Sequence, residues 1–264
     1  MNLNDALDLI QPNIDSDGLI IHNREEWGGG DTAQREGMWY FGLALAFPES
    51  RALIKVWFAT VLRKLEAAPG IYVRHPQVPG CPDWYDDPKD FSRDQSIPLI
   101  VAMGRLGLTE QLDKFHHYTG LRGFKAQNGD LYWWPYYLAM WIRAEADANG
   151  VRFIDYLNPI LWLGDFSLIL ASIWGCLWGK WHPNHSDDVN YVLILLQSHV
   201  LDNPLAKLAR WIYANYRTPI KGTYESWGPA SALEAYFSPK FTDSGAPRID
   251  RLYNESGILK NLIQ

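Results

Sequence analysis

The chain has 264 residues, of which 24 are Lys or Arg and 30 are Asp or Glu, so its formal net charge is −6. This length is enough to bury a hydrophobic core without disulfides, and a composition of 47% hydrophobic and 20% charged residues excludes an intrinsically disordered chain. Because the net charge is negative and basic residues are scattered along the sequence, we expect no nucleic-acid partner.

Apolar residues recur at spacings of three and four along most of the sequence, which predicts an all-α fold. In chain order, the expected helices span residues 31–47, 49–67, 92–106, 109–118, 130–148, 151–157, 186–201, 204–216, 225–236 and 256–262. The apolar stretch at 159–178 is expected to form a further helix or a pair of helices. Short connections join most of them in pairs, so we expect antiparallel helical hairpins. Two short segments, 18–22 and 71–74, could pair locally as strands. No linker or low-complexity tract divides the sequence, and we predict a single domain over residues 1–264.

One predicted helix is apolar enough to raise the question of membrane insertion. Residues 166–179 contain no charge, but a spanning helix needs about 20 apolar residues. Extending the segment to that length would place Pro159 and Asp165 inside the bilayer. We therefore predict a buried core helix and no membrane partner.

Cysteine usage and the N-terminal sequence give two further expectations. Cys81 and Cys176 are far apart and belong to no CxxC motif or Cys/His cluster, so we expect free thiols. The N-terminal sequence lacks the basic and apolar regions of a signal peptide. We expect a cytoplasmic protein, or one released by another route.

Five helices are preceded or opened by clusters of polar residues. The clusters occupy residues 28–36, 90–95, 128–130, 185–190 and 223–227. If alternate helices run in the same direction, these openings share one rim, where helix N-termini present partial positive charge and free N–H groups. The pattern predicts a polar site above an apolar ring.

Alternating inner and outer helices, an interior rich in Trp and Tyr, and acidic openings on the inner helices resemble the α/α toroids of glycoside hydrolases and polysaccharide lyases. The resemblance is architectural and extends over most of the chain. It implies five to six helical hairpins and a groove at the rim for an oligosaccharide or polysaccharide.

Glycoside hydrolysis requires a protonated carboxyl group and a second carboxylate that acts as base or nucleophile. Asp31 follows three glycines at a predicted helix start, and Asp94 lies in the first turn of another helix. We predict Asp31 and Asp94 as the catalytic pair, with Asp188 as a third catalytic carboxyl. Arg35 and Arg93 are expected to keep one carboxyl ionised, whereas burial against aromatic side chains would raise the pKa of the other.

The expected substrate-binding residues lie in or beside the same openings, where aromatic rings can stack on sugars. They are Arg35, Glu36, Tyr40, Arg93, Gln95, Trp134, His185, Asn190, Tyr191, Glu225 and Trp227. We expect no metal and no other cofactor, because Pro183 breaks the helical spacing of His182 and His185. The aspartates at 83–94 lack the pattern of a calcium-binding loop, which leaves calcium as the weaker interpretation there.

Two alternatives remain open. In a polysaccharide lyase, His185 or Tyr191 would remove the proton beside a uronate carboxylate, and Asn190 and Tyr40 would gain importance. In a structural or carbohydrate-binding protein, the polar openings would only cap helices, as expected for Ser92.

Overall fold

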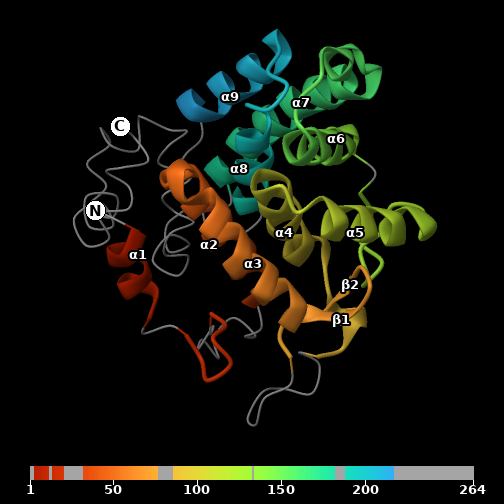
Figure 1. Ribbon diagram of the computed structural model, residues 1–264. Helices are drawn as coiled ribbons and strands as arrows, with labels where there is room; N and C mark the ends of the chain where they lie inside the picture. The colour runs from red at the N-terminus through yellow and green to blue at the C-terminus, as the bar shows by residue number, and fades with distance from the viewer. Residues whose placement is uncertain are drawn as a thin grey trace. The chain divides into compact units, whose positions relative to one another are not determined.

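The computed structural model describes residues 3–11, 14–20, 32–76, 86–132, 134–181 and 188–216. These residues are mostly helical, in agreement with the predicted all-α class. Contacts between Cα atoms divide the chain into two compact units, Asn2–Trp133 and Trp134–Gln264 (Figure 1). We call them the N-terminal unit and the C-terminal unit. The single domain stays a prediction, and the helices expected at 225–236 and 256–262 lie outside the described residues.

The N-terminal unit consists mainly of helices that follow one another as hairpins. Its helices are α1 (Leu3–Ile10), α2 (Thr32–Ala46), α3 (Arg51–Leu65), α4 (Arg93–Leu106) and α5 (Thr109–Leu121). It also contains the 3₁₀ helices η3 (Pro48–Ser50) and η4 (Pro88–Asp90), and the antiparallel strands β1 (Glu66–Ala68) and β2 (Ile71–Tyr72). The local strand pairing expected near residues 71–74 is therefore present.

Helices α2 and α4 pack side by side and run in the same direction. The backbone N–H of Gln34 donates to Gln95 Oε1 at the start of both helices, and Arg105 lies over the Phe41 ring farther along. Between these contacts, a Cβ atom added to Gly37 would lie only 2.4 Å from the carbonyl carbon of Pro98. Glycine at this position therefore allows the two backbones to approach closely.

Helices α3 and α5 each return beside the helix that precedes them. Lys55 Nζ of α3 donates to the carbonyl oxygen of Gly107, just after the C-terminal end of α4. Gly107 has a φ of 64° and ends α4 in the left-handed conformation that glycine adopts readily. Nearly all of α4 is buried, whereas α3 and α5 bury one stripe each. The N-terminal unit thus alternates buried helices with surface helices.

The C-terminal unit contains α6 (Pro135–Asn149), the 3₁₀ helix η5 (Phe153–Leu157), α7 (Pro159–Trp181), α8 (Asp188–Gln197) and α9 (Pro204–Tyr216). Helix α7 packs against both α6 and α9. Its close approach to α6 occurs at Gly164, where an added Cβ would lie 2.8 Å from the carbonyl oxygen of Pro135. In the part of the chain described, α7 is the one helix whose length and composition would allow it to cross a membrane, with a mean hydropathy of 1.8 over Pro159–Leu177. Of that window, 56% is buried, so the predicted core helix has one buried face and one exposed face.

Several predicted helix ends differ from the structure by two to four residues, and residues 66 and 67, expected to end a helix, belong to β1. Two of the predicted helices differ more. The helix expected from residue 130 begins at Pro135, because Lys125 and Leu131 pair as an isolated β-bridge and hold the intervening residues in a turn. Proline at the first helical position is favourable because its missing N–H would have no helical partner there. The helix expected at 151–157 is the shorter 3₁₀ helix η5.

Candidate functional site

The first turns of α2 and α4 meet in the interior of the N-terminal unit. The N–H of Gln34 lies in the first turn of α2, where backbone N–H groups have no acceptor within the helix, and it donates to Gln95 Oε1 over 3.1 Å. The N–H of Ala33 donates to the carbonyl oxygen of Arg74 over 3.0 Å. The start of α2 is therefore held by hydrogen bonds to two residues distant in sequence, and one of these bonds joins it to the start of α4.

A third polar opening, the turn at residues 125–131, lies against the start of α4. The N–H of Asn128 donates to the carbonyl oxygen of Phe91 over 3.1 Å. The hydroxyl groups of Tyr132 and Ser96 form a buried hydrogen bond. These contacts bring three of the five predicted openings together within one unit, at residues 32–36, 90–95 and 128–130.

Asp94 occupies the first turn of α4. The predicted N-cap is confirmed, since Ser92 Oγ accepts from the N–H of Gln95 at 3.4 Å. The Asp94 side chain is 39% exposed, and its Oδ1 lies 3.6 Å from Arg93 Nε. A partly exposed carboxylate is favoured at this position by the N-terminal end of the helix dipole and by the neighbouring guanidinium.

Glu36, by contrast, is buried one turn into α2, with 1% of its surface exposed. Its Oε1 accepts from the N–H of Ile20 at 2.7 Å. Burial raises the pKa of Glu36 to about 8; the hydrogen bond from Ile20 and the charge of Lys64 lower it, and the charge of Asp15 raises it further. Glu36 is therefore mostly protonated at neutral pH, a property that a general acid requires, although its described contacts are all with protein.

The loop that covers Glu36 is fastened by a buried histidine–aspartate pair. Asp15 Oδ1 accepts from the N–H groups of Asp17 and Leu19, and its Oδ2 lies 2.6 Å from His75 Nε2. His75 Nδ1 faces the carbonyl oxygen of Pro76. Both ring nitrogens thus contact protein oxygens, which indicates a structural role in holding residues 14–20 over α2.

The predicted site residues fall into three groups. Arg35, Glu36 and Tyr40 lie on α2, and Arg93, Asp94 and Gln95 lie on the first turn of α4. Within the C-terminal unit, Asp188, Asn190 and Tyr191 belong to the start of α8, and Trp134 precedes α6. The residues Asp31, His185, Glu225 and Trp227 lie outside the described residues. The catalytic and substrate-binding roles of all these residues stay predictions.

Three predicted substrate-binding residues have well-defined surroundings. Gln95 is buried and joins α4 to α2. The Tyr40 ring packs on Phe58 with centroids 5.0 Å apart, and burial, together with the charge of Glu36, raises the pKa of its hydroxyl. The Trp134 side chain is 61% exposed and stacks on Tyr136 at an interplanar angle of 14°. Of the three, Trp134 offers the most accessible ring for contact with a sugar.

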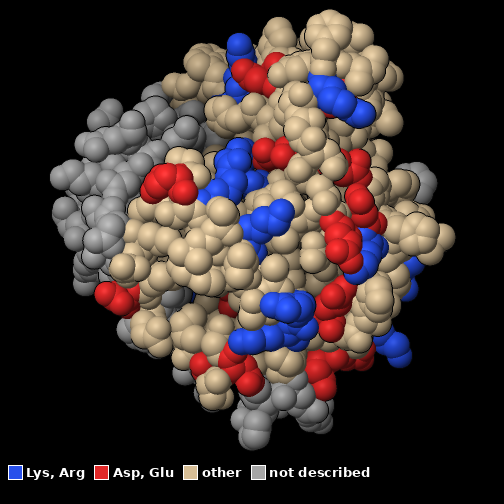
Figure 2. All heavy atoms as spheres, in the orientation of Figure 1, with Lys and Arg blue, Asp and Glu red and all other residues tan. Residues whose placement is uncertain are grey.

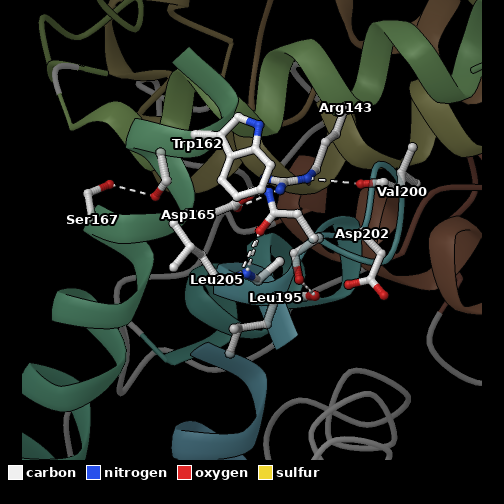
Figure 3. Close-up of polar contacts among 12 residues, drawn as sticks. Arg143, Trp162, Asp165, Ser167, Leu195, Val200, Asp202 and Leu205 are labelled. Atoms are coloured by element: carbon white, nitrogen blue, oxygen red, sulfur yellow. Dashed lines mark hydrogen bonds and ion pairs between the residues drawn. The ribbon is translucent and has the colours of Figure 1, made fainter. Parts of the chain in front are cut away.

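A buried ionic cluster in the C-terminal unit was not among the predicted sites (Figure 3). Arg143 Nη2 of α6 donates to Asp165 Oδ1 of α7 at 2.5 Å, and Arg143 Nε donates to the carbonyl oxygen of Val200 at 2.9 Å. The other oxygen of Asp165 accepts from Asn203 Nδ2. Asn203 Oδ1 in turn accepts from two backbone N–H groups in the first turn of α9.

This cluster fastens α6, α7 and the turn before α9 to one another. Burial raises the pKa of Asp165, while Arg143 and Asn203 act in the opposite direction. Arg143 and Asp165 are 1% and 0% exposed, so neither is accessible to a ligand. The sequence signal for the cluster was a single acidic residue inside an apolar helix, since a buried charge requires a partner.

Within the described ranges, no group of three or more His, Cys, Asp or Glu side chains is arranged to hold a metal ion. A comparison of the chain with protein-family models, curated proteins and solved structures found no match.

Proposed function

We propose that this chain is a glycan-active enzyme, a glycoside hydrolase built as an α/α toroid, with its reaction centre at the starts of α2 and α4. The hydrogen bond between the Gln34 N–H and Gln95 Oε1 is the observation on which the proposal depends. This bond joins the first turns of the parallel helices α2 and α4, and α3 runs back between them in the sequence. A toroid of helical hairpins is expected to repeat this arrangement.

Asp94 is proposed as the ionised carboxylate, acting as base or nucleophile. Its side chain is partly exposed, and both Arg93 and the N-terminal end of α4 stabilise a negative charge there. Asp31, directly before the first residue of α2 in the sequence, is proposed as the acid that protonates the leaving oxygen. Carboxyl pairs in glycoside hydrolases lie ~5–9.5 Å apart, and the proposal requires this separation of Asp31 and Asp94.

The proposal is tested by screening the purified chain on a panel of neutral, amino and uronic-acid polysaccharides. New reducing ends report any cleavage, and near-ultraviolet absorbance reports the unsaturated products of elimination. Asp94→Asn should lower the cleavage rate by about 100-fold or more, because a catalytic acid or base contributes that much. Asp113→Asn, which changes an exposed carboxylate on α5, is the matched control and should retain the wild-type rate.

Three outcomes contradict this proposal. Products with unsaturated ends would indicate a polysaccharide lyase. Binding without cleavage would indicate a carbohydrate-binding protein. Wild-type cleavage by both Asp31→Asn and Asp94→Asn would remove the proposed catalytic pair.

A further inference from the structure

The exposed side of α7 carries a continuous apolar stripe. Six side chains form it, each between 41% and 56% exposed: Leu163, Phe166, Leu170, Ile173, Trp174 and Leu177. Their spacing of three or four residues, with one adjacent pair, places them along one side of the helix. We call this surface the α7 stripe. Phe153 and Ile154 of η5, 80% and 61% exposed, lie just before the helix and add further apolar surface to the same unit.

The α7 stripe contains no charged side chain. Asp165, the acidic residue of α7, is buried on the other side and paired with Arg143. In Figure 2 the surface over α7 and α9, at the top of the view, is mostly uncharged, with a few acidic and basic side chains, some of them adjacent. Large contiguous apolar patches of this kind on a folded protein usually mark a contact surface.

The area of the surface is that of a stable interface. At the stated exposures, the stripe alone presents roughly 600 Å² of apolar surface and the two η5 side chains add roughly 250 Å², and the sum is close to the ~800 Å² that each partner buries in a standard protein interface. The largest apolar patch of an ordinary monomer is about 300–600 Å². Its aromatic side chains, Phe166 and Trp174, are of the types enriched in interface cores.

A lipid surface fits these residues less well than a protein does. Membrane-surface helices attract anionic lipids through clustered Lys and Arg, but Arg152 beside η5 is paired with Asp155 at 2.9 Å, and the chain carries a net charge of −6. Insertion of α7 across a bilayer would separate it from α6 and α9 and expose the buried pair of Arg143 and Asp165. The observations therefore favour a protein partner.

We propose that the α7 stripe is the contact surface between two copies of this chain. A uniformly apolar surface without its own charges is self-complementary, because a two-fold axis then brings apolar side chains against apolar side chains. Interfaces between identical chains are also more apolar than other protein interfaces. The two copies of α7 pack against each other in antiparallel orientation, with Leu170 near the middle of the contact.

Sedimentation velocity of the full chain is the first test. The wild type should sediment as a species of twice 30.3 kDa. Leu170→Arg should weaken self-association by about 30-fold or more, the effect of a charge at an interface hot spot. Leu121→Arg, on α5 and 74% exposed, is the control and should remain dimeric. Circular dichroism verifies that both variants are folded. A monomeric wild type, or a Leu170→Arg variant as dimeric as the control, would overturn the proposal.

A photo-crosslinking amino acid at position 170 identifies what covers the stripe. Copies labelled with light and heavy isotopes are mixed, so that links between copies can be distinguished from links within one chain. Links between α7 of one copy and α7 of the other are expected. Links within one chain to residues 217–264 would show that this segment covers the stripe, and would overturn the dimer. Binding to phosphatidylcholine vesicles that Leu170→Arg abolishes would overturn it in favour of a lipid surface.

Discussion

Glu36 makes the stability of the fold depend on pH in a direction opposite to that of most carboxyl groups. Its pKa rises from an ordinary value of 4.5 to about 8 because its side chain is buried. Below pH 4.5 both the folded and the unfolded chain hold this proton. Between pH 4.5 and 8 the unfolded chain releases the proton and the folded chain keeps it, so the free energy of unfolding falls as the pH rises.

The size of the effect follows from the same two values. Each pKa unit corresponds to about 1.4 kcal/mol, so the contribution of Glu36 to the free energy of unfolding falls by about 3 kcal/mol up to neutral pH and by about 5 kcal/mol once the pH exceeds 8. Glu36→Gln removes this dependence, because a carboxamide does not ionise. Its oxygen can still accept from the N–H of Ile20.

Urea unfolding of the wild type and of Glu36→Gln at several pH values between 4.5 and 8 measures the difference directly. The variant should gain in stability relative to the wild type as the pH rises, by the amount given above. Glu49→Gln, which changes an exposed side chain on η3, is the control and should parallel the wild type. A constant difference between Glu36→Gln and the wild type across this range would refute the assignment of a buried, protonated carboxyl.

Three further predictions concern packing and buried polar contacts. Gly37→Ala should lower the free energy of unfolding by about 1–3 kcal/mol, because its Cβ would collide with the α4 backbone, whereas Gly42→Ala, with no atom within 4 Å of its added Cβ, should leave stability unchanged or raise it by up to ~1 kcal/mol. Arg143→Met should cost about 3–5 kcal/mol by leaving a buried carboxylate unpaired, and Arg143→Met with Asp165→Leu should recover most of that loss in a double-mutant cycle of urea unfolding. Gln127→Ala should cost about 1–3 kcal/mol and speed amide-proton exchange in β2, because this side chain makes three hydrogen bonds to β2 and η4.

Local sequence signals predicted most of the helices well. Residues 204–216 form α9 with the expected bounds. Helix α4 ends at Leu106 as expected, and the next residue, Gly107, adopts a positive φ. The start of α6 was predicted five residues too early, because the bridge between Lys125 and Leu131 depends on pairing between separate segments rather than on periodicity. Helix boundaries set by such pairing are not encoded in the spacing of apolar residues.

The interior of the candidate site was less predictable than its helices. The sequence placed Glu36 beside a polar opening, but its burial depends on the loop at 14–20, which the hydrogen bond from Ile20 fastens to α2. Likewise, the contact between Gly37 and Pro98 joins residues far apart in sequence. Hydropathy identified α7 as apolar but could not distinguish its buried side from its exposed side, since both contain large apolar residues.

Azide rescue of an alanine variant tests the proposed catalytic role of Asp94 most directly. On the polysaccharide that the wild type cleaves fastest, Asp94→Ala should be slower by about 100-fold or more. Added azide should restore part of the rate, because the small anion can act where the carboxylate was removed. The control Asp113→Ala should cleave at the wild-type rate both without and with azide. An Asp94→Ala variant that cleaves at the wild-type rate without azide would contradict a hydrolytic centre at the paired starts of α2 and α4.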